Sequence, residues 1–148
     1  MERVELPGPA YADDVVLWLR HQIALLRAGQ FAQLDRGKLV DELEDLVRSE
    51  HRALRHRLEI LVVHLLKCQC QPARKSASWH HTLVTQRLRI VRLFDDSPSL
   101  RRLVAGMLER DYPLAVLEAA HQTGLAHTAF PATLPFTEQQ VLDPDFLP

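Results

Sequence analysis

The fold is decided by residues 36–69, which read RGKLVDELEDLVRSEHRALRHRLEILVVHLLKCQ. This stretch has no proline and a single glycine, Gly37, so little in it interrupts a helix. At 1.5 Å per residue it would form a helix roughly 50 Å long, whose ends should cap the domain or meet a second subunit. Apolar residues recur at steps of three and four, the spacing of one helical face, at Leu39, Leu43, Leu46, Val47, Leu54, Leu58, Leu61, Leu65 and Leu66. We expect the other helices to pack on this face.

The polar residues of the same stretch change sign along its length. Its first half is acidic at 41–45, and its middle is basic at 48–57. Glu50 falls in or beside the apolar face, where an unpaired buried charge would be costly, so we expect it at the solvent margin or paired. A functional carboxylate at Glu50 is the alternative. Glu42 and Trp79 are likewise interpreted as structural polar residues.

Further helices are predicted on both sides of the long one. The first runs from near Asp13 to a stop at Gly29, and another covers about 79–94 after the break at Pro72. Ser97-Pro98 is typical of a helix start and predicts a helix to Arg110. Asp111-Tyr112-Pro113 repeats that pattern and predicts a new helix ending near Gly124. Thr137 and Gln140 have capping-box spacing for a short final turn.

No segment shows sustained strand alternation, so the predicted fold class is all-α. We expect a single domain over 1–148, a bundle of five or six helices organised on the long central one. Residues 36–69 and 79–94 should form an antiparallel helical hairpin. Residues 1–10 are interpreted as a loose arm, and 127–148 as a proline-rich tail that docks, since burying Phe146 and Leu147 would contribute about 1.5–3 kcal/mol each.

Composition excludes several classes of protein. The chain has 148 residues, 47% of them hydrophobic and 25% charged, which suits one globular domain. The opening residues lack an apolar signal core and no run is long enough for a membrane span. Cys68 and Cys70 do not form a disulfide framework, which favours a cytoplasmic protein.

Signals for an enzyme or a cofactor are weak. The five glycines are scattered, so no phosphate-binding loop, dinucleotide fingerprint or nucleophile elbow is present, and we expect no cofactor. Glu118 and His121 have the spacing of a di-iron ligand pair, but such a site needs a second copy of the pair.

One candidate metal site lies at the hairpin. His64 and Cys68 are four residues apart, hence on one helical face, and an antiparallel return would bring His80 or His81 opposite Cys68. Three or four nitrogen and sulfur ligands there would suit zinc. The spacing matches no known zinc motif, so core cysteines and exposed histidines are the preferred interpretation.

Charge is distributed unevenly along the chain. Residues 1–50 carry ten acidic and six basic residues, 51–94 carry one and nine, and 95–148 carry eight and three, for a formal net charge of −1. Either the acidic ends or a second subunit's residues 41–45 cover the basic middle, or it binds an anionic partner such as nucleic acid. The near-neutral total favours internal cover. The candidate anion-binding residues are Arg55, Arg57, Arg74, Lys75, Arg87, Arg89 and Arg92.

Short motifs along nearly the whole chain resemble those of one family. They include Leu25-Leu26-Arg27-x-Gly29-x-Phe31, Leu39-x-x-Glu42-Leu43-Glu44-x-Leu46, Pro72-x-Arg74, Ser78-Trp79, Tyr112-Pro113 and Asp143-x-Asp145-Phe146-Leu147-Pro148. Together they resemble the bacterial family catalogued as domain of unknown function twenty-nine. The resemblance implies an all-helical single domain and no established activity. The chain departs from the family pattern at Arg36-Gly37-Lys38, Cys68 and Cys70.

These observations favour a bacterial interaction or regulatory module without catalytic activity. The alternative is a nucleic-acid-binding accessory protein that uses the basic face, and the third hypothesis is a metal-dependent enzyme. A homodimer or another protein partner is compatible with the long helix, and a membrane partner is not expected.

Overall fold

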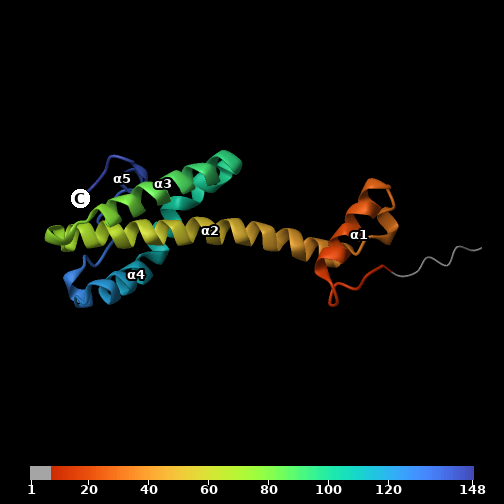
Figure 1. Ribbon diagram of the computed structural model, residues 1–148, viewed down its shortest axis with the longest axis horizontal. Coiled ribbons are helices and arrows are strands. Elements are labelled where there is room, and N and C mark those ends of the chain that lie inside the picture. The colour runs from red at the N-terminus through yellow and green to blue at the C-terminus, as the bar shows by residue number, and fades with distance from the viewer. Residues whose placement is uncertain (1–7) are drawn as a thin grey trace, which may run out of the picture. The chain divides into compact units, whose positions relative to one another are not determined.

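The computed structural model describes residues 8–148, in which all regular structure is helical and no strand occurs. This confirms the all-α fold class. None of the helices in the described range combines the length and apolarity that a membrane crossing requires. The five α-helices, joined through short 3-10 turns, are α1 (Val15–Arg27), α2 (Arg36–Cys70), α3 (Ala77–Asp96), α4 (Val104–Thr123) and α5 (Glu138–Leu142) (Figure 1).

The chain divides into two compact units whose boundary falls between Val47 and Arg48, inside α2. The helix itself is unbroken there, which confirms the prediction that it continues through Glu50. Glu50 is exposed. The single domain over 1–148 stays a prediction, and most of its expected N-terminal arm lies outside the described residues.

In the unit that ends at Val47, the buried Trp18 of α1 forms the centre of the packing. The ring of Tyr11 meets that of Trp18 edge-on, with centroids 5.1 Å apart, and the Tyr11 hydroxyl donates a hydrogen bond to Glu42. The buried Gln22 side chain accepts a hydrogen bond from the backbone N–H of Asp35 at 2.9 Å. Polar contacts of this kind fix the connection between α1 and the start of α2.

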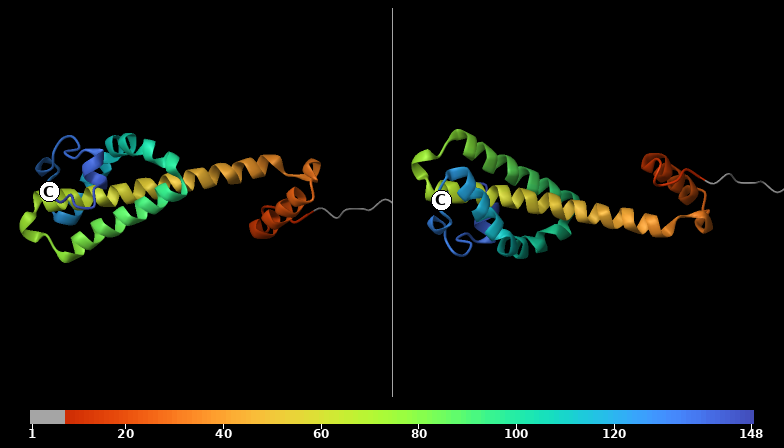
Figure 2. Two further views of the ribbon diagram at one scale, coloured as in Figure 1. Left: turned by 90° about the horizontal axis from the view of Figure 1, so that it is seen from above. Right: turned by 90° about the horizontal axis from the view of Figure 1, so that it is seen from below.

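The unit from Arg48 onward contains the main core. Figures 1 and 2 show α3 and α4 lying alongside the second half of α2, with the C-terminal segment close to α3. The core draws on all of these elements, and its most deeply buried side chains include Leu54, Leu61, Leu65, Leu66, Leu83, Ile90, Val104, Ala119 and Val141.

Several helix ends follow their sequence signals. Asp35 accepts a hydrogen bond from the N–H of Lys38, and Ser76 caps α3 in the same way. Thr137 and Gln140 form the predicted capping box of α5. Gly124 ends α4 with φ of +73°, a left-handed conformation that glycine adopts without strain.

The prediction of a new helix at Asp111-Tyr112-Pro113 is wrong. Residues Pro98–Leu103 form a 3-10 turn, and α4 then runs from Val104 to Thr123 with Pro113 inside it. Pro113 cannot donate to the carbonyl of Glu109, but Glu109 is exposed and water can satisfy that carbonyl. Asp111 lies inside α4 and does not cap a helix, and its carboxylate accepts hydrogen bonds from Arg55.

Other helices pack against α2, which confirms its predicted central place, but the chain does not cover all of its apolar residues. Core residues of this helix begin at Leu54. Leu43, Leu46 and Val47 have the same spacing, yet they are 60%, 63% and 57% exposed. The first half of α2 therefore presents apolar side chains that no described element covers.

Candidate functional site

The four candidate metal ligands do not come together. No group of three or more His, Cys, Asp and Glu side chains within residues 8–148 is arranged to hold a metal ion. His80 and His81 are exposed, whereas Cys68 is buried. Burial raises the pKa of the Cys68 thiol, an effect that Lys75 and Lys67 partly oppose. A thiol with a raised pKa is a poorer source of the thiolate that metals bind.

His64 is half-buried on α2 and is oriented by its own helix. Its Nδ1 lies 2.9 Å from the carbonyl oxygen of Ile60. Burial lowers the pKa of His64, the hydrogen bond to Ile60 opposes that shift, and the nearby charge of Lys67 lowers the pKa further. Helix geometry and core packing thus account for the position of this histidine.

Arg87, a candidate anion ligand, is instead buried against the C-terminal segment. Its guanidinium donates to the carbonyl oxygens of Val141 and Phe146 at 3.0 Å each, and of Gln140 at 3.3 Å. A further contact reaches the carbonyl of Pro144 at 3.5 Å. Burial lowers the Arg87 pKa, while Asp143 and Asp145 raise it. The side chain fastens residues 140–146 to α3.

The other candidate anion ligands differ in their burial and in their partners. Arg57 donates to Gln86 Oε1 at 3.2 Å, and its buried Nε has no partner in the described part of the chain. Lys75 donates to the carbonyl of Pro148. Three further candidates are exposed, namely Arg74, Arg89 and Arg92. The structure does not gather the seven residues on one surface.

Arg55 is the candidate that leads to a site. Its Nε and Nη2 donate to the two carboxylate oxygens of Asp111 at 2.8 and 2.9 Å, and Arg110 donates to Asp111 at 3.3 Å. The hydrogen bond and charge of Asp111 raise the Arg55 pKa. Burial raises the pKa of Asp111, but the hydrogen bonds and charges of Arg55 and Arg110 outweigh it, so the net shift is downward.

Beside this pair lies a hollow of about 510 Å³ that we term the basic groove. α2 contributes three arginines to it, and the 3-10 turn with the start of α4 contributes two. No carboxylate lines it. Its lining residues are Arg48, His51, Arg52, Arg55, Arg102, Leu103, Gly106, Met107 and Arg110.

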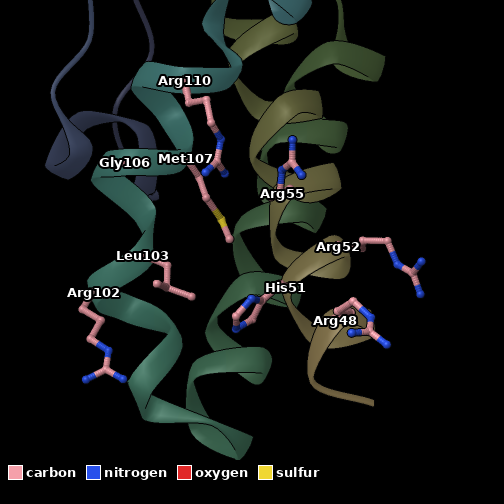
Figure 3. Close-up of a pocket in the computed structure, with 9 residues that line it drawn as sticks. All are labelled: Arg48, His51, Arg52, Arg55, Arg102, Leu103, Gly106, Met107 and Arg110. Carbon is pink, nitrogen blue, oxygen red and sulfur yellow. The ribbon is translucent and has the colours of Figure 1, made fainter. Parts of the chain in front are cut away.

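The side chains of the basic groove separate into a floor and a rim. Figure 3 shows His51 and Met107 directed between the ribbons of α2 and α4, whereas Arg52 and Arg102 lie on opposite outer margins. Met107 is buried, and Arg52 and Arg102 are both exposed. Neither of these two arginines has an ion-pair partner within the described residues. The exposed arginines Arg52 and Arg102 therefore lie on either side of a floor that contains Met107 and His51.

Part of this arrangement could be read from the sequence. Arg48, Arg52 and Arg55 follow one another at steps of four and three, which places them on one face of α2. Nothing in the sequence indicates that Arg102 and Arg110 approach that face, because tertiary packing alone brings them there. Sequence reasoning consequently missed four of the five arginines as candidate ligands.

The arginine side chains of the basic groove are suited to binding an anionic group. Guanidinium groups pair with carboxylates and phosphates through two parallel hydrogen bonds. The nine lining residues include no serine, cysteine, lysine or carboxylate that could act as a nucleophile, and His51 is the one proton acceptor among them.

Comparison with known proteins identifies a family and nothing narrower. The family described as Domain of unknown function DUF29 matches residues 10–147, nearly the whole chain. No curated protein and no solved structure matches significantly.

Proposed function

Because the chain belongs to the DUF29 family, whose description assigns no function, we propose its role from geometry: a non-catalytic interaction module that binds an acidic, amphipathic helix of a protein partner. The observation that carries the proposal is the basic groove, which five arginines line together with the apolar side chains of Leu103 and Met107. An amphipathic helix lays its apolar side into such a groove while its acidic side meets the rim. The free thiols of Cys68 and Cys70 support a cytoplasmic site of action.

A protein partner fits this groove better than a nucleic acid does. Proteins that hold single strands stack bases on aromatic side chains, and no aromatic residue lines the groove. Leu103 and Met107 would have no apolar partner on a phosphate backbone. The formal net charge of −1 also opposes long-range attraction of a polyanion.

The test compares two arginine pairs on the same chain. The groove variant Arg52→Glu with Arg102→Glu reverses two exposed charges at the rim. The control variant Arg89→Glu with Arg92→Glu reverses two exposed charges on α3, outside the groove. Binding is measured by fluorescence polarisation of a labelled helical peptide with leucine on one side and glutamate on the other.

We expect the groove variant to bind the peptide at least about tenfold more weakly, equivalent to about 1.4 kcal/mol, and the control to bind as the wild type does. Equal loss in both variants would show that total charge, and not the groove, attracts the peptide. A 20-base-pair DNA duplex serves as the competing probe. Tight duplex binding at about 150 mM salt that only the groove variant loses would replace this proposal with the nucleic-acid alternative.

A further inference from the structure

The first half of α2 carries an apolar surface of its own. Val40, Leu43, Leu46 and Val47 are 52%, 60%, 63% and 57% exposed, although they stand within two turns of one helix. Exposed apolar residues scattered singly need no explanation, but a cluster of four marks a surface that another molecule covers.

The stretch 40–47, which contains these four apolar residues, is also acidic. Asp41, Glu42, Glu44 and Asp45 lie among the apolar ones, and 39–47 contains no basic residue. Glu42 accepts a hydrogen bond from the Tyr11 hydroxyl, and Glu44 and Asp45 also have interactions within the chain. The Asp41 side chain is exposed. Residues 40–47, here the acidic segment, therefore form an amphipathic acidic helix.

We infer that the acidic segment of a second copy of this chain occupies the basic groove. The inference rests on the proposed function, because it names the partner of the same site. The groove takes an acidic helix with an apolar side, and the acidic segment has that chemistry. Complementary charge identifies the occupant: the exposed carboxylate of Asp41 in the acidic segment of one copy faces the exposed rim arginines Arg52 and Arg102 of the other.

The order of charges along α2 sets the direction of the pairing. The helix is continuous from Arg36 to Cys70, with acidic residues at 41–45 directly before arginines at 48, 52 and 55. Two such helices crossing antiparallel near Arg48 place each acidic segment against the other copy's arginines, and both contacts form at once, as two-fold symmetry requires. A parallel pair in register would place acids on acids and arginines on arginines.

Charge reversal on each side of this contact provides the test. The groove variant is again Arg52→Glu with Arg102→Glu, and the segment variant is Asp41→Lys with Asp45→Lys; all four residues are exposed. Sedimentation equilibrium measures the dimer dissociation constant of each protein alone and of a 1:1 mixture. Circular dichroism checks that both variants keep the wild-type helix content.

We expect each variant alone to dimerise at least tenfold more weakly than the wild type, since like charges then face each other twice. The 1:1 mixture should recover a heterodimer, because the glutamates of one variant's groove meet the lysines of the other's segment. Higher salt should weaken the wild-type dimer. Recovery in the mixture cannot arise from an interface that lies elsewhere.

Three results would overturn the inference. A wild type that stays monomeric while its groove binds the acidic peptide leaves the proposed function intact and removes self-docking. A dimer that survives both charge variants but is lost in Leu43→Ser with Leu46→Ser forms through apolar contact outside the groove. A monomer whose groove also fails to bind the peptide refutes the proposed function along with the inference.

Discussion

The two halves of α2 have the same apolar spacing and opposite surroundings. Leu61 in the second half has no exposed surface, whereas Leu43 in the first half is 60% exposed. Both belong to one unbroken helix, and both sit in a leucine-rich pattern with steps of three and four. Periodicity therefore identifies the residues that share a face. It does not identify the face that the same chain covers.

Lys67 in the second half of α2 and Asp41 in the first half also differ in their burial and in their partners. In the second half, the amino group of the buried Lys67 donates to Gln122 at 3.0 Å and lies 4.6 Å from the ring centroid of Trp79. Burial lowers the Lys67 pKa, while Cys68 and Glu118 oppose that shift. In the first half, Asp41 faces solvent. Lys67 thus has its polar partners within the chain, whereas the Asp41 carboxylate is exposed to solvent.

The largest expected effect comes from matched leucine truncations in the two halves. Leu61→Ala should reduce the free energy of unfolding by about 2–5 kcal/mol, because it leaves a cavity in a closed core. Leu43→Ala should change it by less than about 0.5 kcal/mol, because an exposed leucine loses little on truncation. Urea unfolding at low protein concentration measures both. Equal losses would contradict the contrast between the halves.

The next effect concerns Arg87, which fastens the C-terminal segment to the packed unit. Arg87→Met keeps an apolar stem of similar reach and removes the donors to the carbonyls of Val141 and Phe146. Leaving these hydrogen bonds unmade should cost about 1.5–3 kcal/mol. Arg89→Met, two residues away and exposed, is the control and should stay within about 0.5 kcal/mol of the wild type.

Removal of residues 143–148 sharpens that experiment. The deletion should lower the Tm by several degrees, because Phe146 packs on the core and its carbonyl binds Arg87. Two of the four Arg87 acceptors disappear with the deletion, so the losses from Arg87→Met and from the deletion should not add. Additive losses would show that the arginine and the segment stabilise the fold separately.

Local signals predicted much of the fold. The predicted capping box at Thr137 and Gln140 forms because a side-chain acceptor placed before a helix acts over three residues, and Asp35 and Ser76 cap their helices by the same local rule. The error at Pro113 has the same origin. An acidic residue followed by an early proline is compatible with a helix start and with a helix interior, and the local sequence does not distinguish the two.

The candidate site was less predictable, because it depends on contacts between elements. The steps between Arg48, Arg52 and Arg55 place them on one face, but the approach of Arg102 and Arg110 is a property of the packed chain. The sequence did not indicate that Arg87 is buried, because its hydrogen-bond acceptors are backbone carbonyls, which every residue carries. The charge of Arg87 therefore predicted an anion ligand, whereas in the fold this side chain binds the backbone of the C-terminal segment.

The smallest expected effect is the pH dependence of the stability that the Arg55–Asp111 pair contributes. It distinguishes Asp111, which has an ion-pair partner in the fold, from Asp41, which is exposed to solvent. The net pKa of Asp111 in the folded protein lies below its ordinary value of 3.8, so its ionised form stabilises the fold above that pH. This stabilisation is lost as the pH falls through the folded-state pKa. Because the Arg55 side chain is 43% exposed, Asp111→Asn should cost only about 0.5–1 kcal/mol at pH 7.

The difference in unfolding free energy between wild type and Asp111→Asn should therefore begin to shrink below about pH 4, where the carboxylate of the unfolded chain takes up a proton, and should disappear once the pH falls below the lowered folded-state pKa. Urea unfolding at pH 7 and at pH 3, in low salt, measures it. Asp41→Asn in the exposed half of α2 is the control and should leave the stability nearly unchanged at both values. A constant difference at both pH values would mean that the asparagine disturbs packing, and that the Arg55–Asp111 pair adds no charge-dependent stability to the second half of α2.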